Sequence, residues 1–313
     1  MYNSVMELAN LWLPAEARLD GIRQAKKSDA EAILHLLKTA VYTHFHVDWY
    51  LPGDWIGSPG FVLLPRKSAQ KSSLTAKLFQ GSSDLEACLI ATPDPLPAAW
   101  VRTVAIERAS NAKEILANLL LHVVPNLKKQ GVNQLAWLPV DGWPVNWLPE
   151  WGFYPGNEIE TYVKEDRSLP ALPNVPGLNI RPVQSADYDV LASLETASFA
   201  PIWRQSARAL AVARPHSLSF DVALLDGEVV GYQLSARAEA GAHLVRLTVH
   251  PDKQGLGIGT ALLHHAFSYY YRRGLYKVSL NTQVENYNSQ KLYQRFGFEP
   301  TQQRLPIWVL DIF

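Results

Sequence analysis

Alternating apolar and polar positions in the last quarter of the chain predict a strand that is followed closely by a helix. Residues 243–249 place Val245, Leu247 and Val249 at every second position, as a strand with one buried face does. Downstream, apolar residues recur at helical spacing, and Gly274 stands where such a helix would end. These helical apolar positions are Leu262, Leu263, Ala266, Phe267 and Tyr270.

A glycine-rich turn, Gln254-Gly255-Leu256-Gly257-Ile258-Gly259, joins the predicted strand to the predicted helix. A helix N-terminus offers unpaired N–H groups and partial positive charge, and glycines let a phosphate approach the backbone. The spacing is neither that of a dinucleotide fingerprint nor that of a P-loop. The turn therefore predicts a site for a nucleotide-like ligand of another kind, and a turn without a ligand is the alternative.

A second strand and a second helix are predicted after Gly274. Residues 276–281 have the pattern of a strand, and the next helix would begin at Asn288, a possible N-cap, and end at Gly297. Ser289 and Tyr293 are four residues apart and share one helix face, with Asn286 just ahead. The pattern indicates a polar face on a short helix.

Together these motifs resemble the GNAT superfamily of N-acetyltransferases. Gln254-x-x-Gly257-x-Gly259 is similar to its acyl-CoA pyrophosphate loop, and the run from Asn286 to Phe298 is similar to its second signature. The resemblance covers residues 178–313 and includes a hairpin signal at Asp226-Gly227. It implies an α/β (α+β) fold in which helices flank a mixed, mostly antiparallel central sheet.

The resemblance also implies that acetyl-CoA is the co-substrate. Its pantetheine arm would pair with the strand edge at Leu247 and Val249, and the N–H of Leu247 or Thr248 would stabilise the oxyanion. Asn286 would lie near the pantetheine or adenine, and Ser289 is a further cofactor-binding candidate or simply a residue at the start of the helix. The backbone groups expected on the pyrophosphate are those of Gln254, Gly255, Leu256, Gly257, Ile258, Gly259 and Thr260.

Two proton transfers need groups of suitable pKa. Tyr293 matches the position of the usual general acid of the family, although a core aromatic would show the same spacing. His243 is a candidate general base because imidazole titrates near neutrality, but it is equally typical of a solvent-facing residue at a strand entry. Glu195 and a water relay are further candidates for the base.

The acceptor-binding residues are expected between the first two strands of the second half. Phe199 and Trp203 could line a pocket and Glu195 could pair with an ammonium group, or all three could be ordinary core and surface residues. The expected reaction is direct attack of a primary amine, on a small molecule or peptide, on the thioester. A different acyl-CoA donor and a non-catalytic acyl-CoA sensor are the alternatives.

The first half of the chain repeats the second. The six-residue spacing from Arg23 to Asp29 recurs from Arg181 to Asp187, and both halves end on an aromatic-Gly-Phe motif around Gly152 and Gly297. The positions that match Gln254, Gly255, Gly257 and Gly259 are Asn111, Ala112, Glu114 and Leu116. A carboxylate there would repel a diphosphate. The first copy is therefore predicted not to bind acetyl-CoA.

The predicted organisation is a degenerate GNAT-like domain at 1–165, a proline-rich linker at 166–177 and a catalytic domain at 178–313. Basic and acidic residues both total 29, which argues against nucleic acid as a partner. No apolar run suits a membrane span and no signal peptide is evident, so a cytoplasmic monomer or homodimer is expected.

A metal site is not expected. Cys88 is the single cysteine, which excludes an internal disulfide and a cysteine cluster for metal. His44, His46 and Asp48 could be read as metal ligands, but no second ligand group follows at zinc-like spacing. Packing of the neighbouring aromatic residues is the preferred interpretation of this segment.

Overall fold

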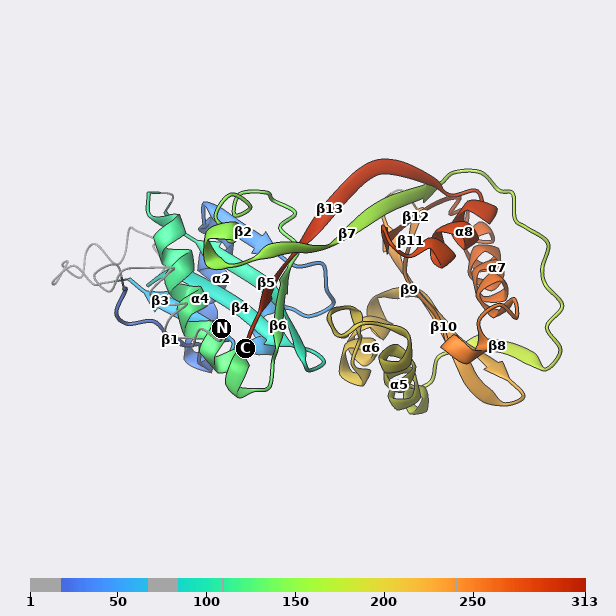
Figure 1. Ribbon diagram of the computed structural model, residues 1–313, viewed down its shortest axis with the longest axis horizontal. Coiled ribbons are helices and arrows are strands. Elements are labelled where there is room, and N and C mark those ends of the chain that lie inside the picture. Colours follow the sequence, from blue (N-terminus) through green and yellow to red (C-terminus); the bar gives the residue numbers. More distant parts are fainter. Residues whose placement is uncertain (1–17, 67–83, 109, 240) are drawn as a thin grey trace. The chain divides into compact units, whose positions relative to one another are not determined.

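The computed structural model describes residues 18–66, 84–108, 110–239 and 241–313. The chain forms two compact units: unit 1 comprises residues 1–156 and 307–313, and unit 2 comprises residues 157–306. Each unit is a mixed, mostly antiparallel sheet with helices on both faces, so the predicted fold class is confirmed (Figure 1).

Unit 1 has the strand order β1-β3-β4-β5-β6-β13, and β2 pairs with β5. Only the β5–β6 contact is parallel among the strand pairs described for this unit. The elements are β1 (Arg23–Gln24), α2 (Ala30–Thr39), β2 (Tyr42–Phe45), β3 (Phe61–Pro65), β4 (Leu85–Pro93), β5 (Ala98–Ile106), α4 (Ala112–Lys129) and β6 (Gln134–Trp137), with short 3₁₀ turns at Lys27–Asp29, Pro52–Trp55 and Leu148–Trp151.

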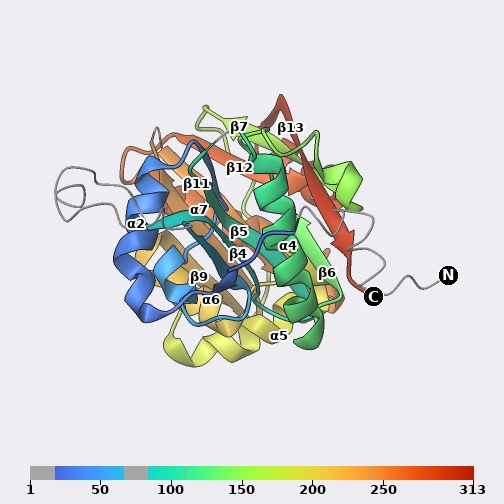
Figure 2. The same cartoon turned by 90° about the vertical axis from the view of Figure 1, so that its left-hand side faces the viewer.

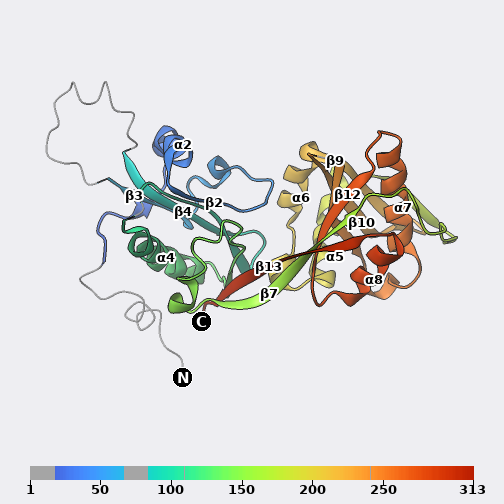
Figure 3. The same cartoon turned by 90° about the horizontal axis from the view of Figure 1, so that it is seen from above.

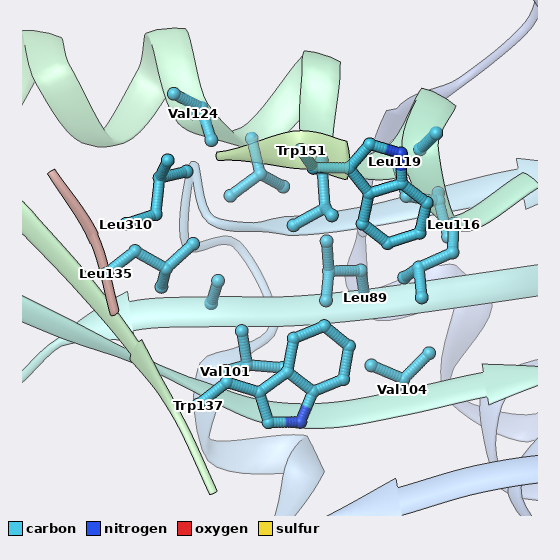
Figure 4. Packing of buried hydrophobic residues seen from close by; sticks show 14 of the residues in the cluster. Leu89, Val101, Val104, Leu116, Leu119, Val124, Leu135, Trp137, Trp151 and Leu310 are labelled. Carbon is cyan, nitrogen blue, oxygen red and sulfur yellow. The ribbon is translucent and has the colours of Figure 1, made fainter. Parts of the chain in front are cut away.

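Helices α2 and α4 cover opposite faces of the unit 1 sheet (Figures 2 and 3). The strand period of two sends Leu89 to the α4 face and Cys88 to the α2 face. On the α4 side, Leu116, Leu119 and Val124 point at the sheet and meet a core that includes two tryptophans (Figure 4). Burial on both faces explains why β4 reads as a continuous apolar run rather than an alternating one.

Unit 2 has the strand order β13-β7-β12-β11-β10-β9-β8. Figure 1 shows α5 and α6 on one side of β9 and β10 and α7 with α8 on the other. The elements are β7 (Tyr154–Lys164), β8 (Leu178–Pro182), α5 (Tyr188–Ser198), α6 (Ala207–Ala213), β9 (Ser217–Leu225), β10 (Glu228–Ala238), β11 (Gly241–Val249), α7 (Ile258–Tyr271), β12 (Lys277–Gln283), α8 (Tyr287–Arg295) and β13 (Glu299–Asp311), with 3₁₀ turns at Ser185–Asp187, Pro201–Trp203, Arg214–His216 and Pro251–Lys253.

The apolar pattern predicted these elements because the apolar positions are the ones that become buried when the elements pack. All five helical apolar positions that the sequence indicates in α7 are buried. The Asp226-Gly227 hairpin is present, with φ of 52° and 90° at its two central residues, as a tight turn between right-twisted strands requires. The N-cap of α8 is Asn286, whose Oδ1 accepts from the N–H of Ser289 at 3.2 Å; the expectation of Asn288 in that role was wrong.

The repeated Arg–Asp spacing produces the same ion pair in both units. Arg23 and Asp29 form two hydrogen bonds of 2.8 Å, and Arg181 and Asp187 form two of 2.7 and 2.9 Å. Each aspartate also accepts from a backbone N–H three residues earlier, at Lys26 or Gln184, and so caps the turn that enters a helix. The duplication seen in the sequence thus extends to local hydrogen bonding.

The last segment of each sequence repeat belongs to the unit formed mainly by the other repeat. Residues 157–164 of β7 belong to unit 2 and pair with β12, whereas Ile307–Phe313 belong to unit 1, where Trp308 to Asp311 pair with β6. The compact units therefore differ from the ranges 1–165 and 178–313, which describe the repeats in the sequence. Neither repeat contains all the strands of the unit in which most of it lies.

Deletion of Ile307–Phe313 is expected to unfold unit 1. Trp308, Val309, Leu310 and Ile312 are at most 8 % exposed, and burial of such side chains contributes about 1.5–3 kcal/mol each. Thermal unfolding followed by tryptophan fluorescence measures this, because every described tryptophan except Trp203 lies in unit 1. Deletion of Phe313 alone, which is 69 % exposed, is the control. An unchanged unfolding temperature in the longer deletion would contradict the assignment.

Candidate active site

The candidate site lies where two parallel strands of unit 2 separate. β11 pairs with β12 only from Gly241 to Leu244, after which β12 continues along β7. Beyond Leu244, the edge of β11 that faced β12 has no strand partner among the described residues, while the other edge stays paired with β10. A cleft of about 570 Å³ opens at this point, lined by Leu244 to Val249.

The glycine-rich turn forms one end of the cleft. Gly255 and Gly257 have φ of +79° and +89°, a conformation that favours glycine, and Gly257 is the N-cap of α7. Because glycine has no side chain with which to cap the helix, the first N–H groups of α7 have no side-chain cap. The predicted turn residues lie on the cleft wall except Leu256, which is 51 % exposed. Those that line it are Gln254, Gly255, Gly257, Ile258, Gly259 and Thr260.

Helix α8 also contributes side chains to the lining of the cleft. Asn286, Ser289 and Tyr293 all line the cleft, as the sequence predicts for a shared polar face. Tyr293 is 6 % exposed, and burial raises its pKa to about 12, although Ser289 and the positive charge of Arg246 act in the opposite direction. Its phenol therefore stays protonated at neutral pH and can donate a proton.

The charged residues of the cleft wall are basic. Arg246, Lys253 and Arg295 line it, and no acidic residue does among the described part of the chain. Such a lining favours an anionic ligand and fits the phosphate groups that the glycine-rich turn can bind. Sequence reasoning missed these three residues, because a lone basic residue carries no signal until the strand and helix directions are known.

Glu195 lies beneath the cleft and not on its wall. It is fully buried, and its carboxylate accepts four hydrogen bonds. The donors are the hydroxyls of Tyr232 (2.7 Å) and Thr248 (3.1 Å), the guanidinium of Arg246 (2.6 Å) and the backbone N–H of Gln205 (3.0 Å). Since the carboxylate is already shared by four donors, its predicted pairing with a substrate ammonium or role as base has no support in this arrangement.

Arg246 is held on the cleft wall by this network. It donates to Glu195 and to the carbonyl oxygen of Trp203, and its guanidinium carbon lies 4.2 Å from the centre of the Phe199 ring. Burial alone would lower the pKa of Arg246, but Glu195 and Tyr232 raise it. Of the predicted acceptor-binding residues, Phe199 lines the cleft, whereas the backbone carbonyl oxygen of Trp203 accepts a hydrogen bond from Arg246.

His243 is not brought into the cleft. It lies before the strands separate, opposite Ser279, and its Nδ1 is 2.9 Å from the Ser279 hydroxyl oxygen. Burial lowers the pKa of His243, so the imidazole is neutral at physiological pH. The structure thus places this candidate base apart from Tyr293 and the glycine-rich turn, which it brings together.

In unit 1, described strands pair along most of the corresponding edge. β5 pairs in parallel with β6 from Ala98 to Trp100, and β2 then pairs with the same edge from Thr103 to Ile106. Two further hydrogen bonds extend this pairing: the N–H of Val41 donates to the carbonyl oxygen of Ile106, and the N–H of His46 donates to that of Arg102. These β5 positions match Arg246 to Val249 in the repeat, so β2 occupies the edge that is open in unit 2.

The histidines of this segment have other roles than a metal cluster. His44 is buried with Nε2 3.3 Å from the carbonyl oxygen of Val101, and His46 stacks on Trp100 at 4.6 Å. Asp48 pairs with Arg102. Within the described ranges, no group of three or more histidine, cysteine or acidic side chains is arranged to hold a metal ion. Aromatic packing dominates here, with Tyr42 against Trp143 at 5.0 Å.

Comparison with known proteins identifies the fold and its class of enzymes. The sequence model described as the acetyltransferase (GNAT) family matches residues 188–298. An uncharacterized N-acetyltransferase of Methanocaldococcus jannaschii is 32% identical over 120 residues, which cover 38% of this chain and 76% of that protein. A putative ribosomal protein bS18-alanine N-acetyltransferase of Bacillus subtilis is 23% identical over 121 residues, or 39% and 80% of the two chains.

Solved structures resemble nearly the whole chain. A tandem GNAT protein from the clavulanic acid biosynthesis pathway has a TM-score of 0.56 at 17% identity and covers 94% of this chain and 98% of its own. A GCN5-related N-acetyltransferase from Sphaerobacter thermophilus has a TM-score of 0.55 at 16% identity, with 94% and 97% covered. At these identities the likeness shows a shared tandem fold. None of the described helices has the length and apolar character needed to span a bilayer.

Replacement of Glu195 by Met is expected to destabilise unit 2 by about 3–5 kcal/mol, because it leaves the charge of Arg246 without its buried partner. The double variant Glu195→Met/Arg246→Met should recover part of that loss, since both charges are then removed. Urea denaturation followed by circular dichroism of the two variants measures the difference. A single variant as stable as the wild type would show that the ion pair does not support the strand.

Proposed function

Because this chain belongs to the acetyltransferase (GNAT) family, we propose that it is an acetyl-CoA-dependent N-acetyltransferase with one working site, in unit 2. The observation that best supports this proposal is one cleft that contains both the unpaired edge of β11 and the N-terminus of α7, which has no side-chain cap. The charged residues that line this cleft are basic. A thioester donor with a peptide-like arm and a diphosphate fits both features. The acetyl group would pass to a primary amine.

The donor would bind through backbone groups and basic side chains. The amides of a pantetheine arm are able to pair with the free edge of β11 as a further strand would. The pyrophosphate would accept from the N–H groups between Gln254 and Thr260, where the helix dipole favours negative charge. Lys253 and Arg295 are placed to neutralise phosphate groups on the same wall.

The reaction would be a direct displacement at the thioester carbon. The amine nitrogen forms the new C–N bond, a backbone N–H at Leu247 or Thr248 stabilises the oxyanion, and the C–S bond then breaks. Tyr293 would give its phenolic proton to the departing CoA thiolate. With a pKa of about 12 the phenol is protonated across the physiological range, so its proton is available for transfer.

We assign removal of the amine proton to water rather than to a side chain. His243 is outside the cleft and Glu195 is saturated with hydrogen bonds, and no other histidine or acidic residue of the described chain lines the cleft. This arrangement favours an acceptor that loses its proton readily. An α-amine, with a pKa of about 7.7–8.0, does so more readily than a lysine side chain, with a pKa of about 10.4.

The peptide α-amine is therefore the first acceptor class to test. The B. subtilis relative is named for acetylation of an alanine of a ribosomal protein, which is consistent with this class. Phe199 and Arg246 lie on the wall beside Tyr293 and would contact the acceptor. Unit 1 is proposed not to bind acetyl-CoA, because β2 pairs along its matching edge and Glu114 lies in the first turn of α4.

Calorimetric titration with acetyl-CoA is expected to give one site per chain. Gly255→Asp should bind at least about tenfold more weakly than Gly255→Asn: both side chains tolerate a positive φ and meet open space, so the pair differs by one charge near the phosphates. Thiol release is then followed with peptides and small amines.

Each other outcome of this titration is informative. Two sites would contradict the degenerate first copy, and no binding would contradict the proposed donor. Binding without thiol release for any acceptor would favour a sensor of acyl-CoA. Preference for a longer acyl chain in competition would identify a different donor.

Tyr293→Phe is expected to lower kcat by about 10²- to 10⁴-fold with little change in the Kd of acetyl-CoA. In the wild type, the active form of Tyr293 is the protonated one, and its pKa of about 12 means that its loss begins only near that pH. The rate should therefore rise with pH until the acceptor amine is deprotonated and show no fall below about pH 11. Tyr287→Phe, on the same helix but 65 % exposed, is the control.

A further inference from the structure

Residues 169–177, which the sequence predicts to be part of a spacer between the repeats, lie against the helix that carries the glycine-rich turn. The Nε2 of His264 donates to the carbonyl oxygen of Pro170 at 2.9 Å. Val175 packs in a cluster with Ile258 and Leu262. At the end of the segment, the N–H of Asp226 donates to the carbonyl oxygen of Gly177 at 3.1 Å. The segment is thus fixed to unit 2 along its length.

Pro173 lies directly against Gly257. A Cβ atom placed on Gly257 would be 3.0 Å from the Cβ and 3.2 Å from the Cγ of Pro173, and 3.4 Å from a methyl carbon of Val175. Exposure alternates from Pro173 to Pro176: Pro173 and Val175 are half-buried, whereas Asn174 and Pro176 are exposed. Pro173 and Val175 therefore face the turn and the start of α7.

The segment and the ligand cleft lie on different sides of the turn. Gly257 lines the cleft, whereas no residue between 169 and 177 does. Pro173 therefore touches the loop without being placed to touch a ligand. Its effect on binding, if the loop is the ligand site, must be transmitted through the conformation of Gly257.

We propose that Pro173 and Val175 brace the glycine-rich turn and that Pro173 is a positioning residue for the diphosphate of acyl-CoA. The inference rests on the proposed function. Glycine has the largest conformational freedom of any residue, and a turn with Gly255, Gly257 and Gly259 would lose much entropy on ordering around a ligand. Contact with a rigid proline ring restricts the turn before the ligand arrives, which lowers that cost.

If Pro173 holds the turn in place, its removal should weaken binding only of donors that carry the diphosphate. Pro173→Gly removes the ring from Gly257 and should raise the KM of acetyl-CoA about tenfold with kcat unchanged, because preorganisation acts on binding. Acetyl-pantetheine has no diphosphate and would use only the edge of β11. Its kcat/KM should therefore be the same in the variant and the wild type.

Pro176→Gly is the matched control, since it makes the same change three residues later, at an exposed position. It should leave both donors unaffected. A general loss of structure in Pro173→Gly would impair both donors equally and would overturn the inference, as would an unchanged KM for acetyl-CoA. If the wild-type protein binds no acetyl-CoA, the proposed function itself fails, and this is measured before any variant is made.

Discussion

The end of pairing between β11 and β12 at Leu244 and Leu280 is the constraint on which the candidate site depends. It leaves part of β11 without a strand partner on one edge among the described residues, and the glycine-rich turn and α8 enclose a cleft there. An unpaired strand edge inside a protein is costly unless something holds it. Arg246 and Thr248, on the free part of β11, are both bonded to buried Glu195. This network anchors the strand to α5 without using the edge that faces the cleft.

The two units solve the same problem of an open edge in opposite ways. In unit 1, β2 satisfies the backbone of β5, and tryptophans at 143 and 147 pack against the adjacent core. In unit 2, the edge is left for a partner from outside. The same repeated architecture thus has a paired strand edge in one copy and an open cleft in the other, and the difference is carried by one short strand and a few glycines.

Sequence reasoning succeeded where the determinants are local. The Asp226-Gly227 hairpin and the face shared by Ser289 and Tyr293 each follow from spacing within a short stretch of sequence. It could not foresee the burial of Glu195, because its four donors come from three separate segments. Nor could it foresee that residues 169–177 pack on α7, since prolines indicate stiffness but not the surface against which a stiff segment lies.

The exchange of chain ends has a consequence for how the molecule is made. A ribosome completes the chain from the N-terminus, and domains commonly fold as they emerge. Here Trp308 and Leu310, which fill the core of unit 1, are synthesised after the whole of unit 2. The sheet of unit 1 therefore stays incomplete at one edge until residues 307–313 have been made. A nascent chain of this kind has reason to rely on chaperones, and neither half is a module that recombination could transplant alone.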